Sequence, residues 1–177
     1  MNAQLLDGKK VAEEILSEVR EGVAGKSLKL AVVQVGENRA SEKYIEEKKK
    51  TAEAAGIEVE VFYFKSDIAQ KELEREVERV GKDEKTTGVI VQLPLPKHIE
   101  IKEVLDMIPV EKDVDVLSSL AFDQFSNGTF PVLPPTVAAV QALLMSYGIQ
   151  VQDKKVVLIG SGRLVGLPLS IWLQNQG

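Results

Sequence analysis

Residues 28–50 read LKLAVVQVGENRASEKYIEEKKK and contain the first strand-to-helix unit of the chain. The opening nine residues form a mostly apolar run of strand length, a short polar loop follows, and a helical pattern begins near residue 41. A strand that is apolar on both of its faces is typical of a parallel sheet covered by helices on each side. The unit therefore predicts an α/β fold.

The same alternation continues along the chain. Residues 56–64 (GIEVEVFYF) and 88–96 (GVIVQLPLP) have the β-branched, apolar composition of strands, and the second run ends in two prolines. Helical patterns cover residues 7–23 and 68–83. The order strand, helix, strand, helix, strand predicts a parallel sheet with right-handed crossovers. We assign this sheet to a first domain, residues 1–148.

The later part of the chain has a second strand-to-helix pattern. Residues 101–109 predict a short helix, 111–131 look irregular, and 134–148 predict a helix with a proline-rich start. Residues 149–177 then predict the first strand, 156–159, and first helix of a Rossmann-like second domain. Because the chain ends inside this unit, we expect exposed apolar surface there. The residues concerned are Val157, Ile159, Leu169 and Trp172.

Composition excludes several classes of function. The 177 residues are 44% hydrophobic and 28% charged, as in globular proteins, and the net charge of -5 argues against a general nucleic-acid binder. The absence of cysteine and the single histidine, His98, argue against a metal site. No apolar run reaches the length of a membrane span. We therefore expect a soluble cytoplasmic protein without nucleic-acid, membrane or metal partners.

The helix that starts near residue 41 carries a lysine in its apolar stripe. A period of 3.6 residues places six residues on one face: Ser41, Tyr44, Ile45, Lys48, Ala52 and Ala55. Lys48 either extends its ammonium to water along the core, which is the commoner arrangement, or exchanges protons with a substrate. Tyr44, one turn earlier, could stack on a flat ring or hold the amine. The helix alone leaves both interpretations open.

Three further groups could bind a ligand. Gln92 ends a predicted buried strand, where ligands lie in open α/β sheets, although a buried amide can also bond nearby backbone. Asp113 and Asp115 lie in a loop, where aspartates more often stabilise turns. The glycines at 160, 162 and 166 follow a strand, as in turns that bring backbone against a pyrophosphate. The same glycines also fit a tight turn without a ligand.

Taken in order, five strings resemble the bifunctional methylenetetrahydrofolate dehydrogenase/cyclohydrolase family: VGENRASEKYIEEKKKTAEAAGI, GVIVQLPLPKHI, IPVEKDVD, PPTVAAVQALL and VVLIGSGRLVGLPLSIWL. The resemblance covers nearly the whole chain. It implies a folate-binding catalytic domain and an NAD(P)-binding domain. It also implies oxidation of methylenetetrahydrofolate with NADP or NAD, and hydrolysis of the methenyl product to formyltetrahydrofolate. A full-length form is expected to be a homodimer.

The resemblance also implies roles for single residues. Lys48 would handle protons in the hydrolysis, with Tyr44 against the folate rings and Gln92 beside the lysine. Ser41 and Asp115 would bind substrate, the aspartate at the amino and amide edge of the pterin ring. The glycine-rich turn would hold the cofactor through Gly160, Ser161, Gly162, Arg163 and Gly166.

The sequence departs from the family pattern at three places. Val116 follows Asp115 where the family usually has glycine, PPTVAA lacks a proline and a glycine of the family element, and the turn lacks a usual arginine. Because that arginine is missing, the choice between NADP and NAD as cofactor stays open. Two alternatives also remain: a two-domain dehydrogenase of shikimate or amino-acid type, and a non-catalytic remnant that binds folate or a partner. We expect no NADP-dependent oxidation by the 177-residue chain alone.

Overall fold

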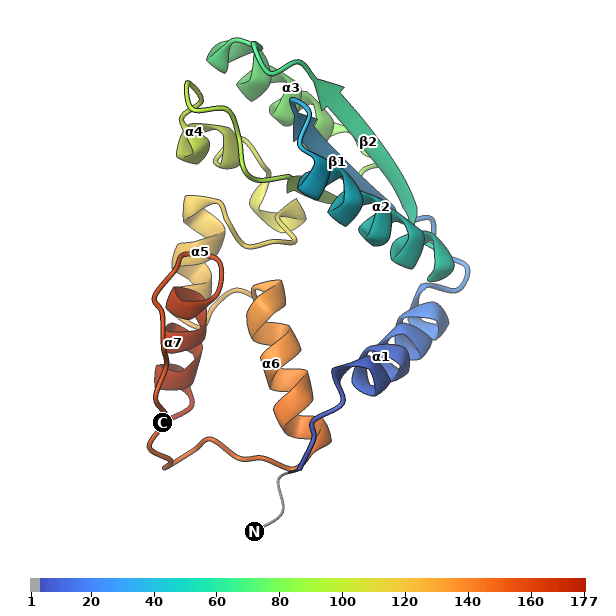
Figure 1. The fold of residues 1–177 in the computed structure, drawn as a ribbon. Helices are drawn as coiled ribbons and strands as arrows, with labels where there is room; N and C mark the ends of the chain where they lie inside the picture. The colour runs from blue at the N-terminus through green and yellow to red at the C-terminus, as the bar shows by residue number, and fades with distance from the viewer. Residues whose placement is uncertain (1–3) are drawn as a thin grey trace.

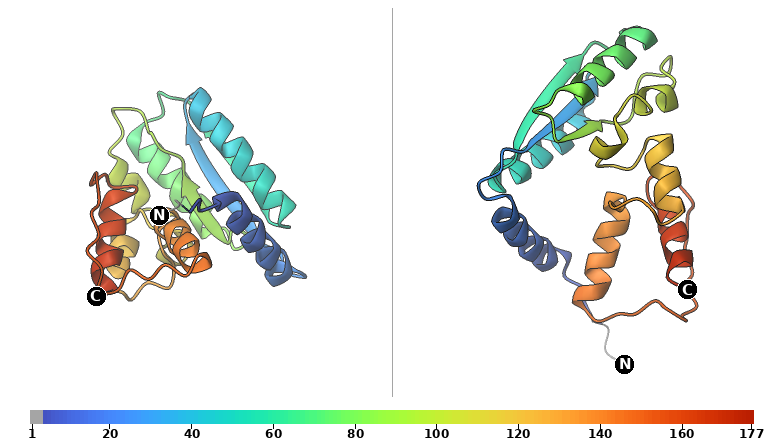
Figure 2. Two further views of the ribbon diagram at one scale, coloured as in Figure 1. Left: turned by 60° about the horizontal axis from the view of Figure 1, so that its bottom comes forward. Right: turned by 180° about the vertical axis from the view of Figure 1, so that it is seen from behind.

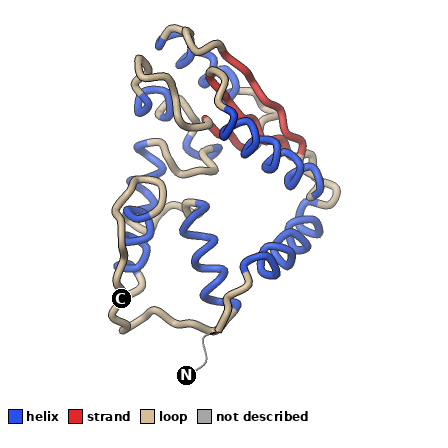
Figure 3. Tube along the Cα trace, in the orientation of Figure 1, coloured by secondary structure: helices blue, strands red, loops and turns tan. Residues whose placement is uncertain are grey.

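A three-stranded parallel sheet is the centre of the first part of the molecule (Figures 1 and 3). The computed structural model describes residues 4–177, apart from the side chain of residue 40. The strands are β1 (Lys29–Val35), β2 (Glu58–Phe64) and β3 (Gly88–Val91), in the order β2-β1-β3. Both pairings are parallel. The predicted α/β class and the three predicted strands are confirmed.

Helices cover both faces of this sheet (Figure 1). They are α2 (Arg39–Ala54) on one side, and α3 (Gln70–Lys82) with the short α4 (Ile101–Leu105) on the other. Side chains alternate along a strand, so Val32 packs with Ile45 of α2, whereas Val33 belongs to the larger cluster that includes Leu73 and Val77 of α3. Burial on both faces explains the nearly continuous apolar runs.

The rest of the chain forms a helical layer below the sheet (Figure 2). It contains α5 (Ser119–Ser126), α6 (Pro135–Ser146) and α7 (Gly166–Asn175), preceded by a 3₁₀ turn, Val110–Lys112. These helices share a second apolar cluster, made of Val116, Ala121, Phe125, Val137 and Trp172. Because Val116 belongs to the loop after the sheet, this cluster fixes the loop against the helices.

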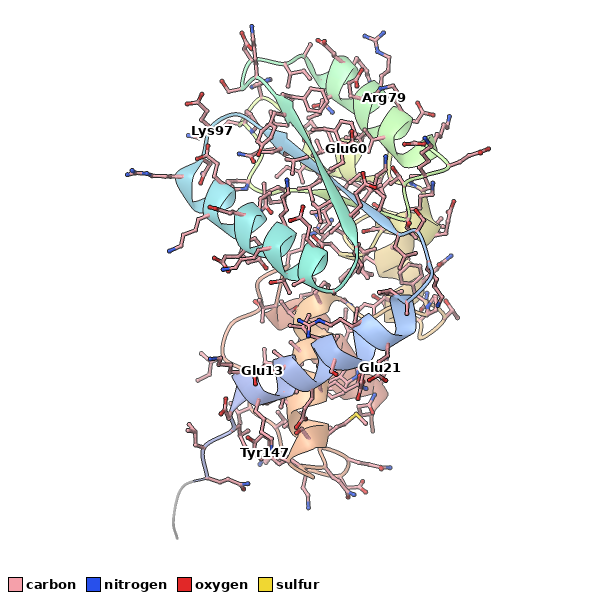
Figure 4. The ribbon with its side chains drawn as sticks, turned by 90° about the vertical axis from the view of Figure 1, so that its right-hand side faces the viewer. Glu13, Glu21, Glu60, Arg79, Lys97 and Tyr147 are labelled. Carbon is pink, nitrogen blue, oxygen red and sulfur yellow. The ribbon has the colours of Figure 1, made fainter. Side chains whose placement is uncertain are left out.

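The helix α1 (Gly8–Val23) lies apart from the sheet and bridges two elements. At its start, the Asp7 N–H donates to the Tyr147 hydroxyl at 2.7 Å, and near its end Arg20 Nε donates to the Ala54 carbonyl at 2.9 Å. Figure 4 shows Tyr147 below this helix, close to its first turn. Over residues 4–177, no helix is both long enough and apolar enough to cross a membrane.

Two predictions about local structure are wrong. Residues 111–131, predicted to be irregular, contain α5, whose first turn is capped by Ser118, with its Oγ 3.4 Å from the Ala121 N–H. Residues 156–159, predicted to be a strand, have no regular structure. A strand needs a neighbour for its N–H and C=O groups, and the described sheet contains only β1, β2 and β3.

The predicted apolar exposure in the second unit is confirmed in part. Val157 is 81% exposed and Ile159 is 97% exposed. Leu169 is half-buried and Trp172 is buried, because α7 packs on the cluster shared with α5 and α6. The expectation of an exposed Trp172 is therefore wrong.

Two helical glycines should respond to alanine with opposite signs. A β-carbon at Gly81 of α3 would press on the Pro109 ring, 3.1 Å from its Cγ, whereas one at Gly22 of α1 would meet no atom within 4 Å. We expect Gly81→Ala to lower the free energy of unfolding by about 1–3 kcal/mol through overpacking. Gly22→Ala should raise it by about 0.5–1 kcal/mol. Urea denaturation measures both, and equal signs would contradict the packing at Pro109.

Candidate ligand site at the strand ends

A cavity of about 630 Å³ lies beside the carboxyl end of β3, between the sheet and the helical layer. Its wall includes residues of α2, of the loop after β3, of the loop at 115–117 and of the glycine-rich turn. The polar side chains that line it are Tyr44, Glu47, Lys48, Thr51, Gln92, Asp115, Thr136 and Arg163. The Tyr44–Lys48 face of α2 and Gln92, which follows β3, therefore line one cleft.

Helix α2 brings Tyr44 and Lys48 together because residues four apart lie on the same face. The Lys48 Nζ lies 4.8 Å from the centre of the Tyr44 ring, within the range of a cation–π contact. The Lys48 side chain is 24% exposed, whereas Tyr44 is 58% exposed. Lys48 thus covers part of the Tyr44 ring, and more than half of the tyrosine stays exposed.

The Asp115 carboxylate faces the same lysine. Its Oδ2 lies 4.0 Å from Lys48 Nζ, and its side chain is 23% exposed. Burial raises the pKa of Asp115 above its ordinary value; Lys48 opposes this shift and Asp113 adds to it. A partly buried carboxylate of this kind accepts N–H donors strongly, because little water competes for its oxygens.

Asp113 has a structural place in the same loop. It is buried, and its carboxylate accepts hydrogen bonds from the backbone N–H groups of Leu117 and Ser118. The general expectation that loop aspartates stabilise turns is met by Asp113. Asp115, two residues later, has its side chain at the cavity instead.

Gln92 directly follows β3, and its N–H donates to the Val33 carbonyl at 2.8 Å. Its Nε2 donates to the Leu93 carbonyl at 2.8 Å, so part of the amide bonds nearby backbone. Its Oε1 is buried and has no hydrogen-bond partner among the described residues. A buried carbonyl oxygen normally has a donor, so Gln92 carries an unsatisfied acceptor in a residue that lines the cavity.

Two residues considered in the sequence lie outside the cavity. Ser41, a predicted substrate-binding residue, is buried in the first turn of α2, where its N–H donates to Asn38 Oδ1 at 3.1 Å. It is not among the cavity-lining residues. His98 is exposed, and its Nε2 lies 3.0 Å from the Ile68 carbonyl.

The glycine-rich turn lines a second, adjoining cavity of about 470 Å³. Gly160 has φ +101°, which favours glycine, and a β-carbon at Gly162 would meet no atom within 4 Å. A β-carbon at Gly166 would lie 2.9 Å from Ser161 Cα and even closer to the Gly160 carbonyl group. The first and third glycines are therefore required by the turn itself, and the second leaves open space. Ser161 does not line this cavity.

Two side-chain hydrogen bonds hold the glycine-rich turn beside the first cavity. An Arg163 guanidinium N–H donates to the Leu117 carbonyl at 3.1 Å, and Thr136 Oγ donates to the Leu164 carbonyl at 2.8 Å. Arg163 lines both cavities. No sequence pattern singled out Thr136, which lies in the first turn of α6 and lines the first cavity.

Polar side chains at the end of a parallel strand, beside a glycine-rich turn that leads into a helix, define an α/β protein with a ligand cleft next to a dinucleotide-binding type of turn. Comparison with known proteins is more specific. Residues 6–115 match the family described as tetrahydrofolate dehydrogenase/cyclohydrolase, catalytic domain, and residues 134–177 match its NAD(P)-binding domain. The chain belongs to the tetrahydrofolate dehydrogenase/cyclohydrolase family. This excludes the alternative of a shikimate-type or amino-acid-type dehydrogenase.

Individual relatives agree with this assignment. The bifunctional protein FolD of Moorella thermoacetica is 40% identical over 98% of this chain and 64% of its own length. The crystal structure of the Campylobacter jejuni bifunctional enzyme FolD superposes with a TM-score of 0.93 at 35% identity, covering 98% of this chain and 64% of that one. A Trypanosoma brucei dehydrogenase-cyclohydrolase, complexed with NADP and inhibitor, gives a TM-score of 0.92 at 33% identity and covers 99% and 63%. The chain thus spans less than two thirds of these relatives.

Proposed function

We propose that the whole protein oxidises methylenetetrahydrofolate with NADP or NAD and hydrolyses the methenyl product to formyltetrahydrofolate. The observation that carries the proposal is the gathering of Tyr44, Lys48, Gln92 and Asp115 around one cavity. Family membership supports the reaction class, and these four side chains are the proposed groups for its hydrolytic step. The cavity also has the 300–1,000 Å³ size common for small-molecule sites.

In the hydrolysis, Lys48 is the proposed proton carrier. After the Lys48 ammonium has released a proton to solvent, its amine takes a proton from the water whose oxygen attacks the methenyl carbon. The ammonium formed in this way then returns a proton to the ring nitrogen as the carbon–nitrogen bond breaks. The remaining hydroxyl proton goes to solvent, which leaves the formyl group. Gln92 Oε1, which is buried and has no partner among the described residues, is the proposed acceptor of a hydrogen bond from the water or from Lys48.

Substrate orientation falls to the other two side chains. The exposed part of the Tyr44 ring can stack on the folate ring system, while Lys48 covers another part of the ring. The Asp115 carboxylate can accept two N–H donors from the amino and amide edge of the pterin. When those donors engage Asp115, its hold on the Lys48 ammonium weakens and the lysine can turn toward the one-carbon bridge. Substrate binding by Ser41 stays a prediction.

The second cavity is the proposed place of the dinucleotide phosphates. The open space around Gly162 and the left-handed backbone at Gly160 leave room for phosphate oxygens beside the first turn of α7. Gly160, Ser161, Gly162, Arg163 and Gly166 are the proposed cofactor-binding residues. NADP or NAD, when bound, supplies the acceptor for a hydride. The protein's part in that step is to hold the substrate in position, which needs no side-chain base.

Three further assignments are proposals of the same kind. We place the boundary between a folate-binding domain and a dinucleotide-binding domain after residue 148, although the second family match begins at residue 134 and includes α6. We propose that the full-length form is a homodimer and that it acts in the cytoplasm. The NADP named for the Trypanosoma relative supports NADP as the cofactor.

Folate binding by the chain is the direct test of the proposal. Titration calorimetry with 5-formyltetrahydrofolate should show one site, and Tyr44→Ala should weaken it, because the stacking surface is lost. Tyr63→Ala is a matched control, since Tyr63 is also exposed but lies on β2, outside the cavity. Absence of binding, or equal effects of both substitutions, would contradict the proposed site.

The glycine-rich turn gives a separate prediction for the cofactor. We expect Gly162→Ala to weaken NADP binding about tenfold or more while changing the urea midpoint little, because its β-carbon meets only the space proposed for phosphate. Gly166→Ala should lower both the NADP affinity and the urea midpoint, because its β-carbon would collide with the backbone of Gly160. Fluorescence titration and urea denaturation measure the two effects. Unchanged NADP affinity in Gly162→Ala would place the phosphates elsewhere.

A further inference from the structure

The loop that carries Asp115 contains a strained residue. Val116 has φ +56°, in the left-handed region that favours glycine, and a β-branched residue is rarely found there. Its side chain is 1% exposed, packs with the cluster that includes Val137 and Trp172, and also lines the cavity. Such a conformation persists only where neighbouring contacts hold it, and it often occurs at functional sites.

Asp113 supplies those contacts on the backbone side. Its carboxylate accepts the Leu117 N–H at 3.1 Å and 3.3 Å from its two oxygens, and the Ser118 N–H at 2.8 Å. Asp113 is itself fixed to the sheet, since it forms a parallel bridge with Val89 of β3 and is 2% exposed. The carboxylate therefore ties the far side of the loop back to the sheet, across Val116. We call these hydrogen bonds from Leu117 and Ser118 to Asp113 the clamp.

The closed loop turns one side chain toward the lysine. The side chains of Asp113 and Val116 are buried. Between them, the side chain of Asp115 is 23% exposed and its Oδ2 lies 4.0 Å from Lys48 Nζ. If the loop relaxed to an ordinary negative φ at Val116, the peptide on either side would rotate, and the direction of the Asp115 side chain would change with it. The distance from Asp115 to Lys48 thus depends on the clamp.

We infer that Asp113 is a positioning residue, whose carboxylate holds the strained loop at Val116 so that Asp115 faces Lys48 and the substrate. The inference rests on the proposed folate site for its functional meaning. With or without a ligand, the clamp is needed because residue 116 is valine and not glycine. A glycine at this position adopts φ +56° without strain, so the clamp should then matter less.

A double-mutant cycle tests this dependence. In the native background, Asp113→Asn keeps the shape but removes the charge and one acceptor oxygen, and we expect the dissociation constant for 5-formyltetrahydrofolate to rise about tenfold, which is about 1.4 kcal/mol. In the Val116→Gly background, the same substitution should raise it less than about threefold. Asp123→Asn, at an exposed position of α5, is the matched control and should leave affinity unchanged.

A role limited to stability predicts the opposite result. Asp113→Asn and Val116→Gly each remove a buried interaction, so without the clamp relation the second substitution would leave the effect of the first unchanged or increase it. The urea midpoint, measured for the same four proteins, gives a readout that needs no ligand. Asp113→Asn should lower it less in the glycine background. If the native chain binds no folate, the proposed function fails, while the urea cycle still decides the clamp; equal midpoint losses in both backgrounds would overturn it.

Discussion

Replacing Lys48 by methionine should slow the hydrolysis of methenyltetrahydrofolate by about 10²–10⁴-fold, the range expected when a general acid–base group is lost. The structure places the Lys48 ammonium over Tyr44 and beside Asp115 in the cavity, and methionine keeps the length and packing of the side chain while removing its proton. Hydride transfer exchanges no proton with the protein, so oxidation should fall much less. The two rates are followed as loss of the methenyl compound, corrected for its spontaneous hydrolysis, and formation of reduced cofactor.

Two further substitutions separate chemistry from charge. Lys48→Arg should not restore hydrolysis, because a guanidinium stays protonated and cannot act as a base. Lys49→Met changes the next residue of α2, whose side chain is 48% exposed and pairs with Glu53 on the surface, and it should leave both rates unchanged. Near-native hydrolysis by Lys48→Met would mean that this lysine only packs along the core and that the proposed proton carrier is another group.

The site residues differ in how well the sequence alone could locate them. Helical periodicity brought Tyr44 and Lys48 to one face, because contacts between residues four apart depend only on local geometry. Gln92 was placed by the rule that ligands lie at the carboxyl ends of parallel strands. For Asp115 the residue pattern favoured a turn, and only the family resemblance indicated a ligand. Asp113 and Asp115 have the same residue type in the same loop, and only the folded loop distinguishes them, since Asp113 bonds the Ser118 N–H and Asp115 lines the cavity.

Other features depended on tertiary contacts and could not be predicted locally. The strand expected at 156–159 has the right composition, yet strand structure needs a partner, and no described strand lies beside it. Trp172, expected to be exposed, is buried because α7 packs on α5 and α6. The bond from Arg163 to the Leu117 carbonyl joins residues 46 positions apart, and no sequence pattern links them.

Replacing Asp115 by asparagine should weaken folate binding and strengthen the fold. A carboxylate can accept two N–H donors from the pterin edge, whereas asparagine offers one oxygen and turns an N–H₂ group toward the second donor. A hydrogen bond to a charged group contributes about 1.5–3 kcal/mol, so affinity should fall about 10- to 100-fold. Titration with 5-formyltetrahydrofolate measures this loss. Asp123→Asn, at an exposed position of α5, should not change the affinity.

The stability effect has the opposite sign because burial raises the pKa of Asp115 above its ordinary value of 3.8. A carboxyl whose pKa is higher in the folded state costs no stability below 3.8, where it is protonated in both states. The cost grows as the pH rises from that value toward the folded-state pKa, and it is fully present above it. Asparagine cannot ionise, so Asp115→Asn should raise the urea midpoint at neutral pH, and the difference should shrink as the pH falls toward 3.8.

Loss of the Lys48 attraction opposes this gain in stability, but that attraction is already included in the net upward shift of the Asp115 pKa. A midpoint that falls at neutral pH would show that the pair with Lys48 outweighs the cost of burying the carboxylate. A gain in stability with a loss of affinity would instead mark Asp115 as a group kept charged for its ligand at the expense of the fold.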